Sequence, residues 1–164
     1  MVISMCLCFG LKKTSKEKKK LQQGIYLKRF LYLLEGEIRY GLSPLPDAIG
    51  RIANKVNDDI RPWLLALNAS LTTYEKQRFS HIWEKKIKES LEPIIIESKL
   101  LQPIYTLGET LGYLDKEMQI KTIEQAMEQL NERIYDIKYD VRKNCKLYQT
   151  MSVCIGFLIV IILI

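Results

Sequence analysis

The stretch "LGETLGYLD", residues 107–115, places two glycines and two acidic residues among apolar ones in a chain that otherwise reads almost wholly as helix. A glycine inside a helix costs about 1 kcal/mol relative to alanine, so both need a packing or turning reason. Gly108 and Gly112 are four residues apart, on one face of a helix, where the missing side chains let another helix approach. Alternatively, Gly112 ends that helix and Asp115 caps the next one. Both alternatives predict a hinge between two packed helices.

Five helices are predicted before this hinge, because apolar residues recur at every third or fourth position. The first covers about residues 21–40, and Gly41 suits its end. Ser43 is then a suitable N-cap, and Pro44 a suitable first helical residue, for the second helix. The third carries Trp63 to Leu71, the fourth covers about residues 74–91, and the fifth runs from beyond Pro93 to the hinge.

After the hinge, apolar residues alternate without a break at spacings of three and four, which is the spacing of a coiled coil. This apolar seam consists of Ile120, Ile123, Met127, Leu130, Ile134, Ile137 and Val141. Such a seam pairs either with a second copy of the chain, giving a homo-oligomer, or with its own bundle, which is the commoner case. No long strand-like alternation occurs. The sequence therefore predicts an all-α antiparallel bundle of about six helices, the last of them long.

Both ends of the chain are apolar and adjoin basic residues. Residues 151–164, "MSVCIGFLIVIILI", carry no charge, and a helix from residue 147 to the end would span about 27 Å. Residues 1–10 are apolar but too short to span, and the lysines after them indicate an end that dips into a membrane from the cytoplasmic side. We expect a short apolar N-terminal segment with a basic juxtamembrane run (1–20), a cytoplasmic helical bundle (21–146) and a C-terminal transmembrane anchor (147–164).

The distribution of charge also favours a membrane over a nucleic acid. Residues 11–29 hold eight basic residues and one acidic residue, and Arg142, Lys143 and Lys146 precede the apolar tail. Between them, residues 30–141 hold fourteen basic and eighteen acidic residues. The net charge of +6 thus lies beside the apolar ends, and the lysine run lacks aromatic residues that could stack on bases. We expect no nucleic-acid partner.

Sequence signals of catalysis are absent. The chain has no GxxxxGK[ST] phosphate loop and no GxSxG elbow, and its single histidine, His81, is expected at the surface. Its four cysteines form no CxxC pair, which argues against a zinc site, although acylation of Cys6 or Cys8 stays open. We expect no enzyme, no cofactor, no metal and no small-molecule substrate.

Three segments together resemble the stage III sporulation protein AB family of endospore-forming bacteria. They are "LEGEIRYGLSPLPDAIGRIA" (34–53), "FSHIWEKKI" (79–87) and "LGETLGYLDKEMQIKTIEQA" (107–126), followed by the apolar tail. The family is similar in turn to the helical domain of the inner-membrane platform protein of type II secretion and type IV pilus machines, where a Gly-Glu-x-x-Gly-x-Leu-Asp turn follows a fifth helix. Here that turn consists of Gly108, Glu109, Gly112, Leu114 and Asp115.

The resemblance implies a non-catalytic membrane scaffold required for endospore formation, in the complex that links mother cell and forespore. It implies a location in the mother-cell membrane around the forespore, with the helical domain facing the mother-cell cytoplasm. Its partners would be the other stage III sporulation A proteins, notably the AA ATPase. Glu109, Asp115 and Glu117 would then cap helix ends or present a negative surface to a basic partner. The alternative is a tail-anchored coiled-coil protein unrelated to sporulation.

Overall fold

The computed structural model describes residues 2–41, 44–73, 78–112 and 115–163, with side chains from residue 15 to residue 143 of these ranges. All regular structure in the described residues is helical, which confirms the all-α prediction. The helices are α1 (Val2–Tyr40), α2 (Leu45–Ala53), α3 (Arg61–Thr73), α4 (Phe79–Lys86), a π-helical turn (Ile87–Leu91), a 3₁₀ turn (Ser98–Leu100), α5 (Gln102–Thr110) and α6 (Lys116–Leu163).

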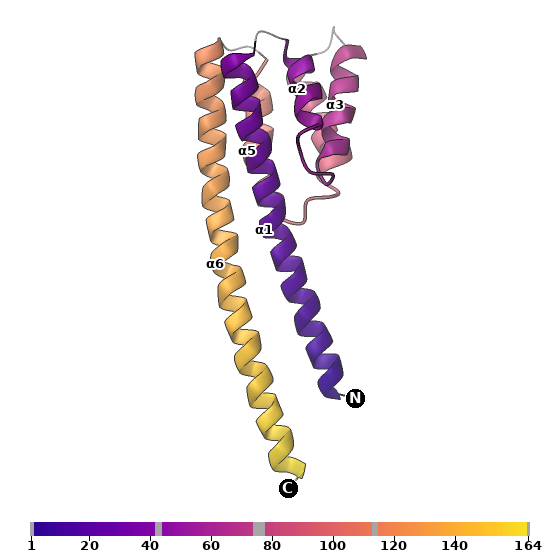
Figure 1. Ribbon diagram of the computed structural model, residues 1–164, viewed down its shortest axis with the longest axis vertical. Coiled ribbons are helices and arrows are strands. Elements are labelled where there is room, and N and C mark those ends of the chain that lie inside the picture. The colour runs from indigo at the N-terminus through magenta and orange to yellow at the C-terminus, as the bar shows by residue number, and fades with distance from the viewer. Residues whose placement is uncertain (1, 42–43, 74–77, 113–114, 164) are drawn as a thin grey trace.

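The long helices α1 and α6 run antiparallel and form the most extensive helix–helix contact of the molecule. Figure 1 shows α2, α3 and α5 beside one half of this pair, and both chain ends at the far end of the other half. We call the end that holds the α1–α2 and α5–α6 connections the distal end. The bundle is the half with the shorter helices, and the stalk is the rest of α1 and α6, from about Gly24 and Ile134 towards the chain ends.

Two helices begin at places that the periodicity did not indicate. α1 begins at Val2 instead of residue 21, because lysine is a good helix former and the lysine run continues the helix. α5 begins at Gln102, not directly after Pro93, and residues 92–97 form most of the connection before it. The fourth helix was predicted from residue 74. Residues 74–77 lie outside the described residues, and α4 begins at Phe79.

Two tryptophans form the centre of the bundle, and both are buried. The rings of Trp63 and Trp83 lie 5.5 Å apart at an interplanar angle of 78°, and Phe30 packs edge-on against Trp63 at 5.2 Å. Edge-to-face arrangements of this kind are favourable because the positive ring edge meets the negative ring face. The indole N–H of Trp83 donates a hydrogen bond of 2.8 Å to the carbonyl of Ile104, so α4 is attached to α5.

Gln23 joins the bundle to the stalk. Its side chain is fully buried, donates to the carbonyl of Ile94 at 2.9 Å and accepts from the N–H of Ile96 at 3.0 Å. Both backbone groups belong to the connection before α5, which has no regular hydrogen-bonding ladder of its own. One turn away, Lys20 forms an ion pair of 3.3 Å with Glu97. α1 therefore determines where this connection lies.

The apolar seam of α6 faces α1 of the same chain. Ile123, Leu130 and Ile137 are buried, and Met127, Ile134 and Val141 are partly buried against the core. Ile120 is half-buried. Gly24 lets the two helices come close, because a Cβ atom there would lie 2.8 Å from Cγ1 of Ile134. Of the two alternatives for the seam, packing within the chain is therefore the observed one.

The predicted membrane segments fall largely outside what the structure describes. Residues 1–10 and the predicted anchor, 147–164, have side chains beyond the described set, although the backbone of α6 continues to Leu163 as one helix. Across the described residues, none of the helices combines the length and the apolar character needed to cross a membrane.

Candidate functional site

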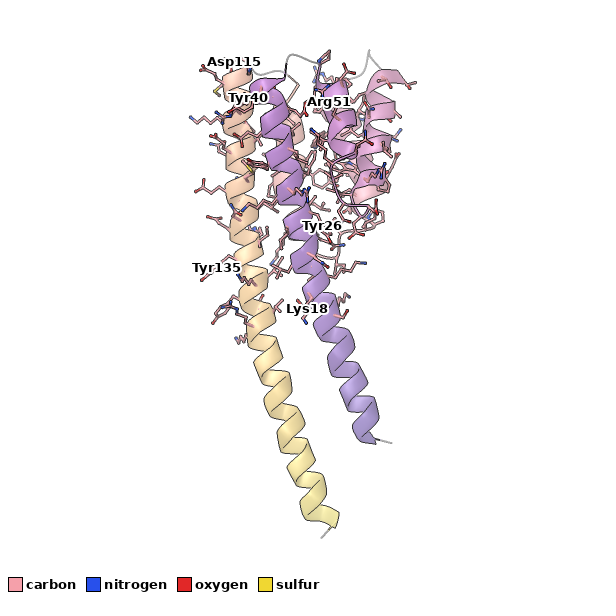
Figure 2. All side chains as sticks on the ribbon, viewed as in Figure 1. Lys18, Tyr26, Tyr40, Arg51, Asp115 and Tyr135 are labelled. Atoms are coloured by element: carbon pink, nitrogen blue, oxygen red, sulfur yellow. The ribbon has the colours of Figure 1, made fainter. Side chains whose placement is uncertain are left out.

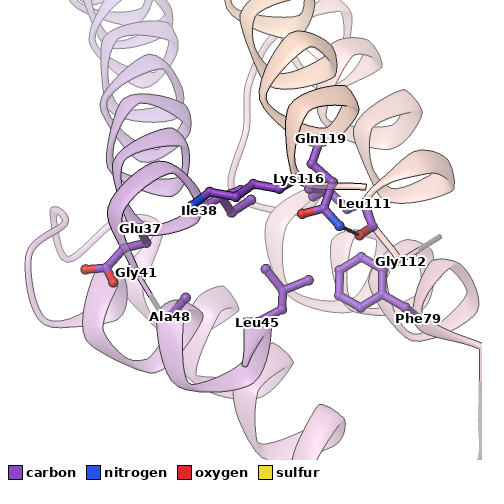
Figure 3. Close-up of a pocket in the computed structure, with 10 residues that line it drawn as sticks. All are labelled: Glu37, Ile38, Gly41, Leu45, Ala48, Phe79, Leu111, Gly112, Lys116 and Gln119. Atoms are coloured by element: carbon purple, nitrogen blue, oxygen red, sulfur yellow. Dashed lines mark hydrogen bonds between the residues drawn. The ribbon is translucent and has the colours of Figure 1, made fainter. Parts of the chain in front are cut away.

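The three segments that carry the family resemblance meet at the distal end, where they enclose a groove of about 430 Å³ (Figure 3). We call it the distal groove. It is lined by Glu37, Ile38, Gly41, Leu45, Ala48, Phe79, Leu111, Gly112, Lys116 and Gln119. Every one of these residues comes from segment 34–53, 79–87 or 107–126. Sequence positions far apart in the chain thus contribute to one surface feature.

Glu37 is the charged centre on the α1 side of the groove. Arg51 donates to it at 2.7 Å and 3.0 Å, and Lys55 at 3.4 Å, so this carboxylate joins α1 to α2 and the chain just after it. The hydrogen bonds from Arg51 lower the pKa of Glu37, with a further contribution from Lys55, while partial burial opposes them. The same contact with Glu37 raises the pKa of Arg51. The ionised form of Glu37 is therefore favoured, and it links α1 to α2.

The connection from α1 to α2 follows the prediction in part. The N–H of Gly41 donates to the carbonyl of Glu37 at 2.8 Å, and a Cβ atom at Gly41 would overlap that oxygen, so glycine is required where α1 ends. Pro44 was predicted as the first helical residue, but its ψ of 152° is not helical, and it is the N-cap of α2 instead. Pro46 occupies the first turn. Ser43 lies outside the described residues.

The hinge residues are explained by packing. A Cβ atom at Gly108 would overlap the indole ring of Trp83, so this glycine lets α5 lie directly against α4. A Cβ atom at Gly112 would lie 3.0 Å from Cβ of Phe79, which Figure 3 shows beside it. No glycine in the described ranges has a positive φ. α5 ends at Thr110, so Gly112 lies just beyond the helix end, as in the second alternative, although its backbone is not left-handed. Its closeness to Phe79 accounts for the glycine.

Asp115 begins α6 as an N-cap. Its carboxylate accepts the N–H of Met118 at 2.8 Å, as expected for a capping aspartate. One turn further on, the side-chain amide of Gln119 donates to the carbonyl of Leu111 at 2.9 Å, across the hinge (Figure 3). Leu114 lies outside the described residues. Asp115 thus caps the start of α6, and Gln119 attaches α6 to the end of α5.

The other two acids of the hinge remain exposed to solvent. Glu117 is exposed on the first turn of α6, and Glu109 is exposed on the last turn of α5. Glu109 borders a second hollow of about 420 Å³, which also includes Arg78, His81 and Tyr105. His81 is exposed, as predicted. Among the described residues, no three His, Cys, Asp or Glu side chains gather where a metal ion could bind.

Sequence reasoning missed Gln23, Glu37 and Phe79. Gln23 lies four residues before Leu27 on the buried face of α1, and a polar residue in an apolar stripe was the available signal. Glu37 pairs with Arg51, which is fourteen positions away in a different helix, so no local spacing indicates the contact. Phe79 lies beside Gly112 only through tertiary packing, which the local sequence does not indicate.

The fold and the distal groove define an all-helical bundle protein with a groove built from three separate segments. The chain belongs to the stage III sporulation protein AB family, whose model matches residues 1–164. It is 26% identical over 137 residues to stage III sporulation protein AB of Bacillus subtilis (strain 168), covering 84% of this chain and 80% of that protein. A solved structure of stage III sporulation protein AB is similar with a TM-score of 0.69 and 25% identity, over 76% of this chain and 97% of that one.

These comparisons confirm the resemblance and indicate a role in sporulation. They also leave the alternative of a coiled-coil protein unrelated to sporulation without support. The seam on which that alternative depended is covered by α1 of the same chain.

Proposed function

We propose that this protein is a non-catalytic scaffold of the sporulation machinery, anchored in the mother-cell membrane and binding its partner at the distal end. One observation carries the proposal: the three family-like segments meet in the distal groove, whereas both chain ends lie at the opposite end of the molecule (Figure 1). A membrane at the chain ends would leave the groove as the part of the protein farthest from it. A scaffold that recruits a cytoplasmic partner needs this arrangement.

The anchor in this proposal is the apolar tail, 147–164, assisted by the basic run in residues 11–29. Basic residues close to an anionic membrane surface contribute about 1 kcal/mol each, and salt weakens this contribution. The location would be the mother-cell membrane that surrounds the forespore, with the bundle in the mother-cell cytoplasm. Residues 1–10 would dip into the same membrane without crossing it.

Deletion of residues 151–164 tests the anchor. The truncated protein is expected to move largely to the soluble fraction at high salt, and to stay partly on anionic vesicles at low salt, because only the basic run remains to hold it. The measurement is flotation with vesicles of anionic and of neutral lipid. A truncated protein that floats fully with neutral vesicles in 1 M salt would show that the tail is not the anchor.

The partner in this proposal is another stage III sporulation A protein, and the AA ATPase is the first candidate. The exposed carboxylates of Glu109 and Glu117 flank the hinge at the distal end and offer a negative surface to a basic partner. Asp115 also carries an exposed negative charge, but its carboxylate caps α6, so it is left unchanged in the test below. The contact would be charge-dependent and would weaken as salt rises.

The double variant Glu109→Gln with Glu117→Gln tests this surface, since it removes two charges and keeps the shape. It is expected to lower pull-down of the ATPase several-fold at low salt while leaving the melting temperature unchanged. Asp58→Asn with Asp59→Asn is a matched control, because it removes two charges after the other end of α2. If the hinge variant binds the ATPase as well as this control at both low and moderate salt, the acids of the hinge are not the contact.

A further inference from the structure

α1 presents an outer face that no other described part of the chain covers. Ile25 and Tyr32 are 50% and 69% exposed, and Lys28 and Arg29 between them are exposed as well. Gly36 continues this face at the next turn, and nothing lies within 4 Å of the place where its Cβ atom would be. The packing of its own chain therefore gives no reason for a glycine there. We call these five residues the basic face.

α6 presents a second uncovered face of opposite charge. Tyr135 and Tyr139 are 72% and 63% exposed, and Glu128 and Glu132 are exposed one and two turns before them. The spacings of three and four place all four residues on one side of the helix. Tyr135 lies on the side of α6 that faces away from α1 (Figure 2). We call these four residues the acidic face.

The charges of both faces are not used within the chain. Among the described residues, Lys28, Arg29, Glu128 and Glu132 take part in no ion pair. Each face also combines aromatic or aliphatic side chains with charges of a single sign. Such a combination is unfavourable in solvent and favourable opposite a complementary surface.

Two contacts between α1 and α6 show which residues stand at the same height. Gly24 lies against Ile134, and Arg39 forms an ion pair of 3.0 Å with Glu124. Because the helices are antiparallel and rise equally per residue, a step forward in α1 corresponds to a step back in α6. Lys28 and Arg29 are therefore level with the turn between Glu128 and Glu132. Counted from Gly24 and Ile134, Ile25 is level with Arg133, two residues from Tyr135.

We infer that a second copy of this chain, standing beside the first in the same membrane, docks its acidic face against the basic face. The shared orientation rests on the proposed anchoring, and it places Lys28 and Arg29 at the height of Glu128 and Glu132. Pairing of two basic faces or of two acidic faces would instead bring like charges together. Gly36 gives the neighbouring α6 room to approach.

The contact joins two different surfaces, so each copy keeps one free face after docking. Such a heterologous contact repeats and leads to a ring or a row of copies, not to an isolated symmetric dimer. The distal grooves would then lie side by side at the same height.

Disulfide cross-linking between two differently tagged, co-expressed full-length copies tests the interface. Both copies carry serine in place of Cys6, Cys8, Cys145 and Cys154, so that only introduced cysteines react. One copy carries Ile25→Cys and the other Tyr135→Cys, and oxidation of the membranes is expected to yield the mixed disulfide. Leu65→Cys is the matched control for Ile25→Cys, because Leu65 is 47% exposed on α3, away from both faces.

Charge reversal adds a second readout. A variant that fails to fold would also lower the yield, but a second charge reversal in the other copy would not restore it. Lys28→Glu with Arg29→Glu is expected to lower the yield at least about fivefold, because two attractive contacts become repulsive. Glu128→Lys with Glu132→Lys in the other copy is expected to restore it. If the copies are in the membrane fraction, either of two results overturns the interface. One is a cross-linking yield no higher than that of the Leu65→Cys control, and the other is a yield that does not respond to charge reversal. Copies recovered in the soluble fraction overturn the anchoring as well, and with it the shared orientation.

Discussion

In the bundle, α1 and α6 are surrounded by the shorter helices, whereas in the stalk the same two helices contact mainly each other (Figure 1). The bundle contains the two tryptophans, and a glycine there, Gly108, lies against a rigid indole ring. The stalk contains exposed lysines, and Gly24, where it begins, lies against the aliphatic side chains of Ile134 and Leu100. Each glycine thus permits a close contact. The neighbour of Gly108 is a rigid indole that cannot shift, whereas the nearest neighbour of Gly24 is an aliphatic side chain that can. Stability should therefore depend mainly on the bundle.

The substitution Gly108→Ala should have the largest effect. The added methyl group would overlap Trp83, and displacing a fully buried indole is expected to cost about 3 kcal/mol of the free energy of unfolding. Urea unfolding of the detergent-solubilised protein, followed by far-UV circular dichroism, measures it. Gly36→Ala is the control, since its methyl group meets nothing and should stabilise α1 by about 1 kcal/mol. If both substitutions changed the free energy of unfolding equally, the contact between Gly108 and Trp83 would not be the reason for the glycine at position 108.

Gln23→Leu should have the second largest effect on stability, because it removes the hydrogen bonds between α1 and the connection before α5. Leucine fills a similar volume but leaves the carbonyl of Ile94 and the N–H of Ile96 without their partner, which is expected to cost about 2 kcal/mol. Hydrogen exchange should at the same time become faster in residues 92–97. Gln22→Leu, at the exposed neighbouring position, should change stability by less than about 0.5 kcal/mol. Unchanged exchange in the Gln23 variant would mean that the connection is held by other contacts.

Gly24→Ala should have a smaller effect than either. The methyl group would approach Cγ1 of Ile134 at 2.8 Å, but this side chain is only half-buried in the two-helix stalk and can shift. Together with the gain in helix propensity, the net cost is expected to be about 1 kcal/mol. The same urea unfolding measures it. A loss as large as that of Gly108→Ala would show that the stalk is packed as rigidly as the bundle.

Glu37→Gln should have the smallest effect, visible mainly in its dependence on pH. The pKa of Glu37 is lowered below 4.5 in the folded protein, chiefly by Arg51, so its contribution is present above about pH 4.5 and is lost as pH falls through the folded pKa. The glutamine variant should therefore lose less stability than the parent between neutral and acidic pH. Melting temperatures of both proteins across this range provide the test, and parallel curves would contradict it.

The sequence was informative wherever a local pattern determines the structure. The seam from Ile123 to Ile137, the helix end at Gly41 and the cap at Asp115 follow from spacing and residue type alone. It was uninformative wherever the reason lies in a distant segment. Gly108 was recognised as a close-packing position, but nothing local identifies Trp83, twenty-five positions earlier, as the side chain that occupies the space. The groove is likewise invisible in the sequence, because its walls come from three separate segments.

The paired indoles also give the molecule an internal optical reporter. Both tryptophans of the chain lie in the bundle with their rings 5.5 Å apart, close enough for their excited states to couple and to transfer energy between them. The stalk carries only tyrosines among its described aromatic side chains, such as Tyr135 and Tyr139. Fluorescence excited at the red edge of the indole band therefore reads the bundle alone, whereas tyrosine signals include the stalk. The two halves of this protein can thus be observed separately without attaching a dye.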